Sequence, residues 1–364
     1  MISLSPNGLN RYQDKAPPQR LLVGTIAGIT VLERGERQKL GDPWKKTGDL
    51  LKGLHLSSIL FEPERGGLFA GIHGGGLHAS KDQGQNWEPR TRGLSKEHVY
   101  TIASQRRNGD LLLFAGTEPA HLFQSKNYGD AWEEIPTLRS VPDTDKWTFP
   151  APPHLGHVKN IVFDPRDSRR MYACIEQGGL FKSEDGGQSW RELAGYYKPT
   201  DEVYKDVHRL VLRPSNPDVM YFTGGEGLYC SQDRGETWEH LTTRASRIGY
   251  PDQLLISPYD DKTMFMAGSA QSPNAWRQTH VANAAIARSR DGGKNWEILE
   301  RGLPKPMRGN IEAMTMAIWA DGFALFIANT DGEVYSSDDE GENWSKIASG
   351  LAPISKVGHY RFLQ

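Results

Sequence analysis

The stretch Ser183-Glu-Asp-Gly-Gly-Gln-Ser-Trp190 returns with small changes along most of the chain. Five further copies of this pattern, Ser-x-Asp-x-Gly-x-x-Trp, stand at residues 80–87, 125–132, 231–238, 289–296 and 337–344. The first residues of successive copies are between 45 and 58 positions apart. A period of about fifty residues indicates one supersecondary unit per copy, with each unit stacked on its neighbours.

Each position of the pattern suits a tight turn. Serine and aspartate side chains form hydrogen bonds with nearby backbone and fix the turn. The glycine supplies the positive φ that such a turn needs, and the tryptophan carries a large apolar ring between neighbouring units. The pattern therefore predicts a hairpin turn followed by a packing anchor, which is a structural role.

The pattern resembles the Asp-box, or BNR, repeat, and the resemblance covers roughly residues 55–345. Asn127 is one departure, because it replaces the usual acid of the box while keeping the ability to make the turn bonds. The resemblance implies β-propeller blades, with the box on the turn between the third and fourth strands. Families that carry the box include sialidases, some endoglucanases, sortilin-type receptors and photosystem assembly factors.

Apolar alternation supports four strands in each repeat, typified by residues 158–163, 171–175, 180–183 and 190–193. Near the N-terminus, strands at 21–25 and 28–33 precede Trp44 and indicate a repeat whose box has decayed and whose first strand is missing. The segment 356–363 is predicted to supply that strand. The expected fold is all-β: a seven-bladed propeller of four-stranded blades, closed by the C-terminal strand joining the N-terminal blade. Residues 1–19 are predicted to form an N-terminal arm, and residues 20–364 a single propeller domain.

Composition excludes several classes of partner. The net charge of −2 gives no strong positive field for nucleic acid or for an anionic membrane. The N-terminal residues lack the apolar core of a signal peptide, and no run is apolar enough to span a bilayer. Cys174 and Cys230 fall on different predicted strands and are expected to be unpaired and reduced. We therefore expect a cytoplasmic protein.

Counting the turns between strands predicts which face of the propeller carries the functional site. The connections that enter the first strand of each blade and leave the second lie on one face, and the box turns lie on the other. Three long loops fall on the first face: 136–156 with Trp147, 194–205 with Tyr197, and 272–285 with Trp276 and Arg277. Long loops in a compact domain are often lids or binding loops, so we expect the site on the face away from the boxes.

Aligning the starts of the first strands brings polar residues into recurrent positions. The first position holds, in ring order, His359, His55, His98, His157, Asp206, Tyr250 and Asn310. Two residues further on stand Arg361, Ser57, Tyr100, Lys159, His208, Asp252 and Glu312. The ends of the second strands carry His73, Glu118, Glu176, Glu226, Ala270 and Asp331. The mouth of the central channel is therefore predicted to be lined with imidazoles and carboxylates.

Such a set suits a transition metal, because imidazole is the commonest neutral metal ligand and carboxylates commonly form hydrogen bonds with metal-bound imidazoles. The predicted ligands of a zinc, iron, copper or nickel ion are His55, His98, His157 and His359. Glu118, Glu176 and His208 are the predicted acids or bases, and Tyr100, Trp147, Tyr197, Trp276 and Arg277 are the predicted substrate contacts. The expected function is a metal-dependent hydrolase or lyase that acts on a small polar or aromatic molecule.

Three other interpretations stay open. The same residues fit a merely solvated polar funnel, or a non-catalytic assembly module that binds a protein or glycan through its aromatic loop residues. A sialidase-like glycosidase is the least favoured, because sialidases need an arginine triad, a tyrosine with a glutamate partner and an aspartic acid. The nearest local match to their first arginine segment, Arg247-Ile-Gly-Tyr-Pro251, is altered.

Overall fold

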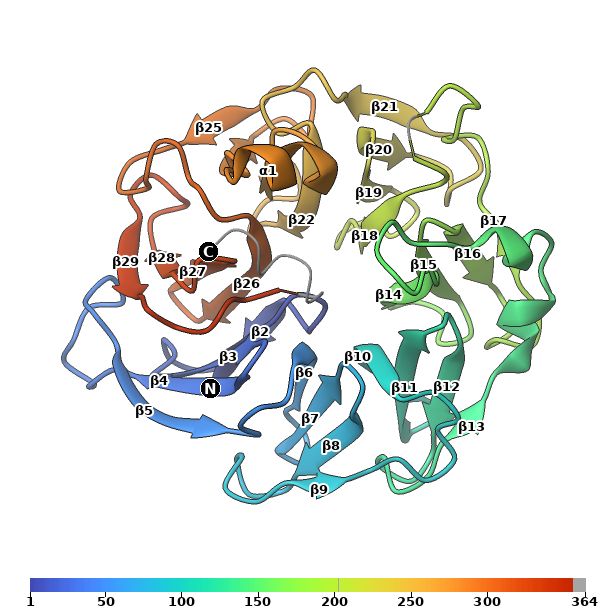
Figure 1. The fold of residues 1–364 in the computed structure, drawn as a ribbon, viewed down its shortest axis with the longest axis horizontal. Helices are drawn as coiled ribbons and strands as arrows, with labels where there is room; N and C mark the ends of the chain where they lie inside the picture. Colours follow the sequence, from blue (N-terminus) through green and yellow to red (C-terminus); the bar gives the residue numbers. More distant parts are fainter. Residues whose placement is uncertain (202, 356–364) are drawn as a thin grey trace. The chain divides into compact units, whose positions relative to one another are not determined.

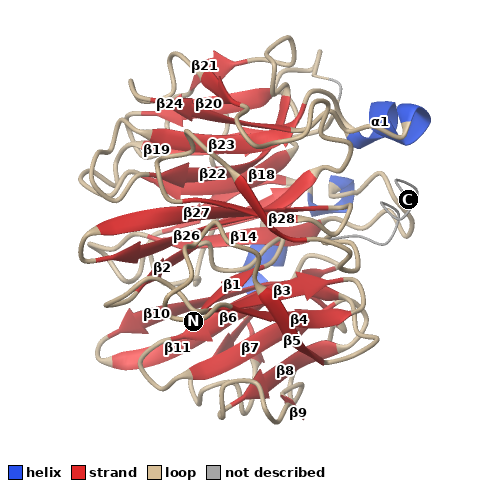
Figure 2. Cartoon of the chain, turned by 90° about the vertical axis from the view of Figure 1, so that its left-hand side faces the viewer, coloured by secondary structure: helices blue, strands red, loops and turns tan. Residues whose placement is uncertain are grey.

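Strands dominate the computed structural model, which describes residues 1–201 and 203–355 (Figure 2). Within these residues, helix is confined to α1 (Pro273–Thr279) and two short 3-10 segments, η1 (Pro136–Ser140) and η2 (Thr144–Lys146). None of the helices in this part of the chain is long and apolar enough to cross a lipid bilayer.

The described strands form seven sheets, six with four strands and one with five (Figure 1). In the blades that carry a box, four strands that follow one another in the sequence pair side by side, and we name them A to D in chain order. The fold class is therefore that of a seven-bladed β-propeller with four-stranded blades, as predicted from the sequence.

The chain divides into two compact units, and each is described by itself. Unit 2 comprises Glu62–Leu241. Three of its blades are β10–β13 (His98–Arg107, Asp110–Glu118, Leu122–Ser125, Glu133–Glu134), β14–β17 (His157–Phe163, Met171–Glu176, Gly179–Ser183, Arg191–Glu192) and β18–β21 (Val207–Leu212, Met220–Gly224, Gly227–Ser231, Glu239–Thr242). A further blade is β6–β9 (Leu56–Glu62, Gly67–Ile72, Gly76–Ser80, Glu88–Pro89), whose first strand contains the passage from one unit to the other.

Unit 1 comprises Met1–Phe61 and Thr242–Gln364. Its blades contain β22–β25 (Tyr250–Ile256, Met264–Ser269, Ala285–Ser289, Glu297–Leu299), β26–β29 (Ile311–Trp319, Gly322–Asn329, Val334–Ser337, Ser345–Ala348) and β3–β5 (Arg20–Thr25, Gly28–Glu33, Lys45–Leu50). Trp44 lies on the turn before β5 and packs edge-on against Phe326, with ring centroids 6.0 Å apart. The decayed box is thus still a packing anchor.

Two short N-terminal strands complete sheets of unit 1. β1 (Ile2–Leu4) pairs in parallel with β3, and β2 (Arg11–Gln13) pairs in parallel with β26. The strand beside β3 is therefore the N-terminal β1, which corrects the prediction that segment 356–363 takes this place; that segment lies outside the described residues. The physical reason is local: Ile2 and Leu4 are buried, at 2% and 0% exposure, so even this short run gains from joining the sheet.

The box turns carry the bonds that the sequence predicts. Ser183 Oγ donates to Asp185 Oδ1 at 2.8 Å, and the backbone N–H groups of Gly187 and Ser189 donate to Ser183 Oγ and Asp185 Oδ1 at 2.8 and 2.9 Å. The φ of Gly187 is +94°. In the copy at residues 125–132, where asparagine replaces the usual aspartate, Asn127 Oδ1 accepts the corresponding hydrogen bond from the Ala131 N–H at 2.9 Å. The turn-forming role of the box is confirmed.

A β-bulge recurs near the start of strand A. The register shifts after the second residue of β14, so that Lys159 is the extra residue. The same shift occurs at corresponding positions of four other A strands, at Tyr100, His208, Asp252 and Glu312. A bulge bends its strand and re-aims a side chain. The second polar position found by aligning the repeats is thus the bulged residue of each of these blades.

Candidate functional site

In unit 2, the first residues of the A strands meet the last residues of the B strands. His98 pairs with Glu118 across β10 and β11, and His157 pairs with Glu176 across β14 and β15. The box turns join strands C and D at the opposite end of the same blades. The prediction that the histidines and glutamates share the end away from the boxes is confirmed for these blades. We call this set, His98, Glu118, His157 and Glu176, the A–B end.

Glu118 lies between two histidines. Its Oε1 is 3.5 Å from Nδ1 of His98, and its Oε2 is 3.5 Å from Nδ1 of His157. On the other side of the His157 ring, Nε2 is 2.7 Å from Oε2 of Glu176. His157 is completely buried, and Glu118 and Glu176 are nearly so. Both ring nitrogens of His157 therefore face carboxylates, which hold its orientation.

The charges at the A–B end stabilise one another. Burial alone would raise the pKa of Glu118, but the neighbouring His157 and His98 outweigh it and lower the pKa to about 2. Burial alone would lower the pKa of His157, but its bonds to Glu118 and Glu176 outweigh burial and raise the pKa above its ordinary value. At neutral pH, Glu118 is therefore an ionised carboxylate and not a proton donor.

The charge cluster continues into the next blade. Nζ of Lys159 is 3.2 Å from Oε2 of Glu176, and Nε2 of His208 is 3.9 Å from Oε1 of the same carboxylate. His208 also lies 3.2 Å from Oδ2 of Asp206, the residue just before β18. One donor atom each from Glu176, Asp206 and His208 lie within 4.8 Å of one another. These three side chains are close enough to share a metal ion, and Lys159 is the cation beside them.

Aromatic rings cover the cluster. Tyr100, the bulged residue of β10, stacks on His157 with ring centroids 3.9 Å apart, and Phe149 of the 136–156 insertion meets the same ring edge-on at 4.9 Å. His73 meets His98 edge-on at 4.3 Å. The His98 side chain is 34% exposed, whereas Tyr100 and His157 are fully buried. A ligand in solution can therefore reach the cluster through His98.

The predicted substrate contacts have different surroundings. Trp147 is 7% exposed and packs on Phe181, with ring centroids 5.3 Å apart. Trp276 of α1 is 2% exposed, and its Nε1 donates to the carbonyl of Gln271 at 3.0 Å. Tyr197 is partly exposed, beside Tyr204 at 5.3 Å. Arg277 also belongs to α1. A role of these residues in substrate binding stays a prediction.

The structure brings two of the four predicted metal ligands into one cluster. His98 and His157 both approach Glu118, as described above. His55 belongs to unit 1, where its Nε2 is 2.7 Å from the carbonyl oxygen of Ser355. His359 lies outside the described residues. Alignment of the repeats places Asp206 and Lys159 at recurrent polar positions without assigning them a role. The structure places Lys159 beside Glu176, and Asp206 beside both His208 and Glu176.

A family model and several known proteins resemble this chain. The model of the Sortilin-Vps10 family (sortilin, neurotensin receptor 3) matches residues 120–279 and 180–307, which together span just over half of the chain. An oligoxyloglucan-reducing end-specific xyloglucanase from Emericella nidulans is 21% identical over 53% of this chain, which spans 24% of the length of that relative.

Two further similarities extend over most of both proteins. The photosystem II assembly lipoprotein Ycf48 of Synechococcus is 25% identical over 88% of this chain and 83% of its own length. A solved structure of YCF48 bound to D1 peptide superposes with a TM-score of 0.53 at 16% identity, covering 93% of this chain and 88% of that one. At this identity the superposition supports the fold alone.

Proposed function

This chain belongs to the Sortilin-Vps10 family of propeller repeats, and from that premise we propose that it is a binding module of the assembly type. It holds a segment of a partner protein at the A–B end of unit 2. The exposed edge of His98 makes one contact with the partner, and Tyr197 of the loop 194–205 makes another. The buried Glu118 beside His98 keeps its ring in place.

The observation that carries this proposal is that the charged groups at the A–B end stabilise the ionised forms of one another. Glu118 stays ionised because its pKa is about 2, and the pKa of His157 is raised by carboxylates on both sides of its ring. An efficient general acid or base needs a pKa near the working pH. Glu118 is thus held in one charge state, which suits recognition, because a fixed charge keeps its neighbours in an unchanging arrangement toward a ligand.

Coverage of the relatives also favours binding over hydrolysis. The similarity to the Ycf48 assembly lipoprotein runs along most of both chains, and a solved YCF48 is bound to D1 peptide. The similarity to the xyloglucanase covers about a quarter of that enzyme. The region of the enzyme that resembles this chain is thus only one part of a larger catalytic protein.

Selection from a library of random displayed peptides tests the proposal. We expect the wild-type protein to enrich peptides whose affinity falls about tenfold in Tyr197→Ala and in His98→Ala, since an aromatic or imidazole contact at an interface is worth about 1.4 kcal/mol or more. Tyr259→Ala is the matched control, because Tyr259 is 59% exposed and belongs to unit 1. Its affinity is expected to equal that of the wild type.

Two results would contradict the binding module. One is that the library yields no enriched peptide; the other is that the enriched peptides bind the Tyr197 and His98 variants as tightly as they bind the wild type. The same preparations are incubated with xyloglucan oligosaccharides. Release of new reducing ends that stops in Glu118→Gln would support a hydrolase in place of the binding module.

A second candidate is the metal-dependent hydrolase expected from the sequence. It is favoured by one observation, the closeness of Glu176, Asp206 and His208 within 4.8 Å. An imidazole and two carboxylates form a donor set that suits zinc or iron. A bound ion would supply Lewis-acid activation of water or of a carbonyl. Lys159 opposes this candidate, because its ammonium group already neutralises Glu176 from 3.2 Å.

Elemental analysis of protein purified without a histidine tag tests the metal site. The hydrolase candidate requires about one equivalent of zinc, iron, copper or nickel, lost in Asp206→Asn while the melting temperature stays close to that of the wild type. Less than about a tenth of an equivalent in the wild type rejects the metal site. Full retention of the metal in Asp206→Asn would mean that the ion binds elsewhere.

A further inference from the structure

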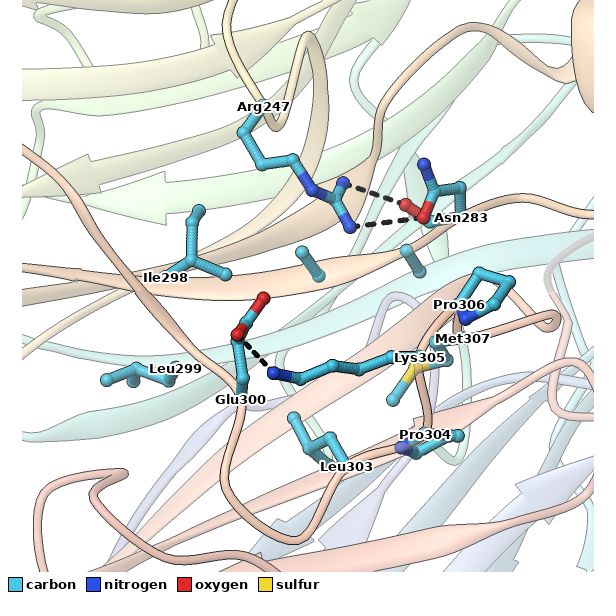
Figure 3. Close-up of a pocket in the computed structure, with 12 residues that line it drawn as sticks. Arg247, Asn283, Ile298, Leu299, Glu300, Leu303, Pro304, Lys305, Pro306 and Met307 are labelled. Carbon is cyan, nitrogen blue, oxygen red and sulfur yellow. Dashed lines mark hydrogen bonds and ion pairs between the residues drawn. The ribbon is translucent and has the colours of Figure 1, made fainter.

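A cavity of about 310 Å³ opens in unit 1, beside β24 and β25 (Figure 3). Its apolar wall includes Ile298, Leu299, Leu303 and Met307, and Arg247 lies at its edge. The volume falls within the range of small-molecule sites, which are mostly apolar with a few well-placed polar groups. The cavity belongs to a different unit from the A–B end, and the proposed function does not use it.

The guanidinium of Arg247 has neutral partners. It donates from Nη1 to the backbone carbonyl of Asn283 at 2.9 Å and from Nη2 to Oδ1 of the same residue at 3.2 Å (Figure 3). Within the described part of the chain, no carboxylate forms an ion pair with Arg247. The carboxylate of Glu300, which also lines the cavity, pairs instead with Lys305. The ionic groups of the lining therefore leave one positive charge uncompensated.

The geometry of Asn283 holds this charge in place. Asn283 has a φ of +49°, a left-handed conformation that asparagine adopts more readily than most residues. Its neighbours are fixed in turn, because Ala284 donates its N–H to the carbonyl of Met307 at 3.1 Å and Ala282 donates to that of Arg308 at 2.8 Å. The arginine is thus oriented before any ligand arrives, which lowers the entropy cost of binding.

We propose that this cavity binds a small monocarboxylate with an apolar body, with the carboxylate on Arg247 and the hydrocarbon against Ile298, Leu303 and Met307. A guanidinium that still has N–H groups to donate binds a carboxylate through charge-assisted hydrogen bonds. The apolar wall gains the hydrophobic free energy of the ligand body. A dianion such as a phosphate ester fits less well, because one uncompensated cation faces it and Glu300 would repel the second charge.

Hexanoate and its neutral analogue hexanamide are suitable probes, with binding measured by saturation-transfer NMR and titration calorimetry. We expect hexanoate to bind wild-type protein about tenfold more tightly than hexanamide, and the preference to disappear in Arg247→Met. Arg247→Lys should keep part of the preference, because it retains the charge without the planar fork. Arg37→Met removes one charge from an exposed residue of the same unit that does not line the cavity, and it should bind hexanoate like the wild type.

Ile298→Glu provides an independent test of the apolar wall. Ile298 is partly exposed, so the substitution is expected to leave the fold intact while a carboxylate at the wall repels hexanoate. Circular dichroism and thermal melting of each variant report its folding. Equal binding of hexanoate and hexanamide, undiminished hexanoate binding in Arg247→Met, or the absence of hexanoate binding to the wild type would each overturn the proposal. None of these outcomes depends on the A–B end, so the two proposals fail or succeed separately.

Discussion

His157→Ala is expected to lower the free energy of unfolding by about 3–5 kcal/mol, the usual cost of removing one partner from a buried ion pair. The imidazole stands between Glu118 and Glu176, at 3.5 and 2.7 Å, and is completely buried. Its loss leaves two nearly buried carboxylates facing each other across a vacated volume. The stacking of Tyr100 on the same ring is lost as well.

Urea unfolding followed by tryptophan fluorescence measures this change, and His121→Ala is the matched control. His121 also pairs with a glutamate of unit 2, Glu134, at 2.6 Å, but the two side chains are 19% and 33% exposed. An exposed pair contributes about 0.2–1 kcal/mol. If both variants lose the same stability, the burial of the A–B end contributes nothing special and the interpretation of its charges is wrong.

The pH dependence of stability gives a second readout of the same substitution. The folded pKa of Glu118 is about 2, below the ordinary 4.5, so its contribution is present above pH 4.5 and is lost as the pH falls toward 2. The folded pKa of His157 is raised above 6.5, so its contribution is present below pH 6.5 and is lost as the pH rises through the folded value. Their combined contribution is greatest between these ordinary values, and His157→Ala should flatten both limbs.

Gly93→Ala is expected to cost about 2–4 kcal/mol, through backbone strain and a steric clash together. Gly93 has a φ of +87°, and a Cβ atom there would lie 2.0 Å from the carbonyl oxygen of Trp132. That carbonyl cannot easily retreat, because the N–H of the same tryptophan donates to the Arg92 carbonyl at 2.9 Å. The anchor tryptophan of one blade thus fixes the backbone of the preceding blade.

Gly109→Ala separates the cost of backbone strain from the cost of the steric clash. Gly109 has a similar φ of +90°, but no atom lies within 4 Å of the position that a Cβ would take there. Equilibrium unfolding in urea is expected to show a loss of about 1 kcal/mol for Gly109→Ala, from the conformation alone. Equal losses in the two variants would show that the approach of Trp132 to Gly93 does not constrain the backbone.

The sequence predicts the repeat, the number of blades and the end of the blade that carries the histidines. It does so because the box is a local structure: its bonds join residues two and four positions apart, such as Ser183 to Asp185 and to Gly187. Eight residues therefore specify the turn without help from the rest of the chain. Once the turns are placed, strand order follows, and His98 and His157 fall at the start of strand A.

The sequence is a poorer guide at the N-terminus. Residues 2–4 form too short an apolar run to stand out as a strand, yet β1 pairs with β3. Three residues gain little by themselves, and they form a strand because an existing sheet offers hydrogen bonds and a buried surface. Such a gain depends on the partner and is invisible in the segment itself.

The tertiary structure alone decides what the polar residues of unit 2 do. Alignment of the repeats identifies Lys159 and His208 as recurrent polar positions, but only the strand register shows that both are bulged residues. Likewise, the sequence suggests that His98 and His157 converge on a metal ion, whereas the structure places Glu118 between them. Local hydrogen bonding determined the turns, and the packing of one blade against the next determined which charges meet.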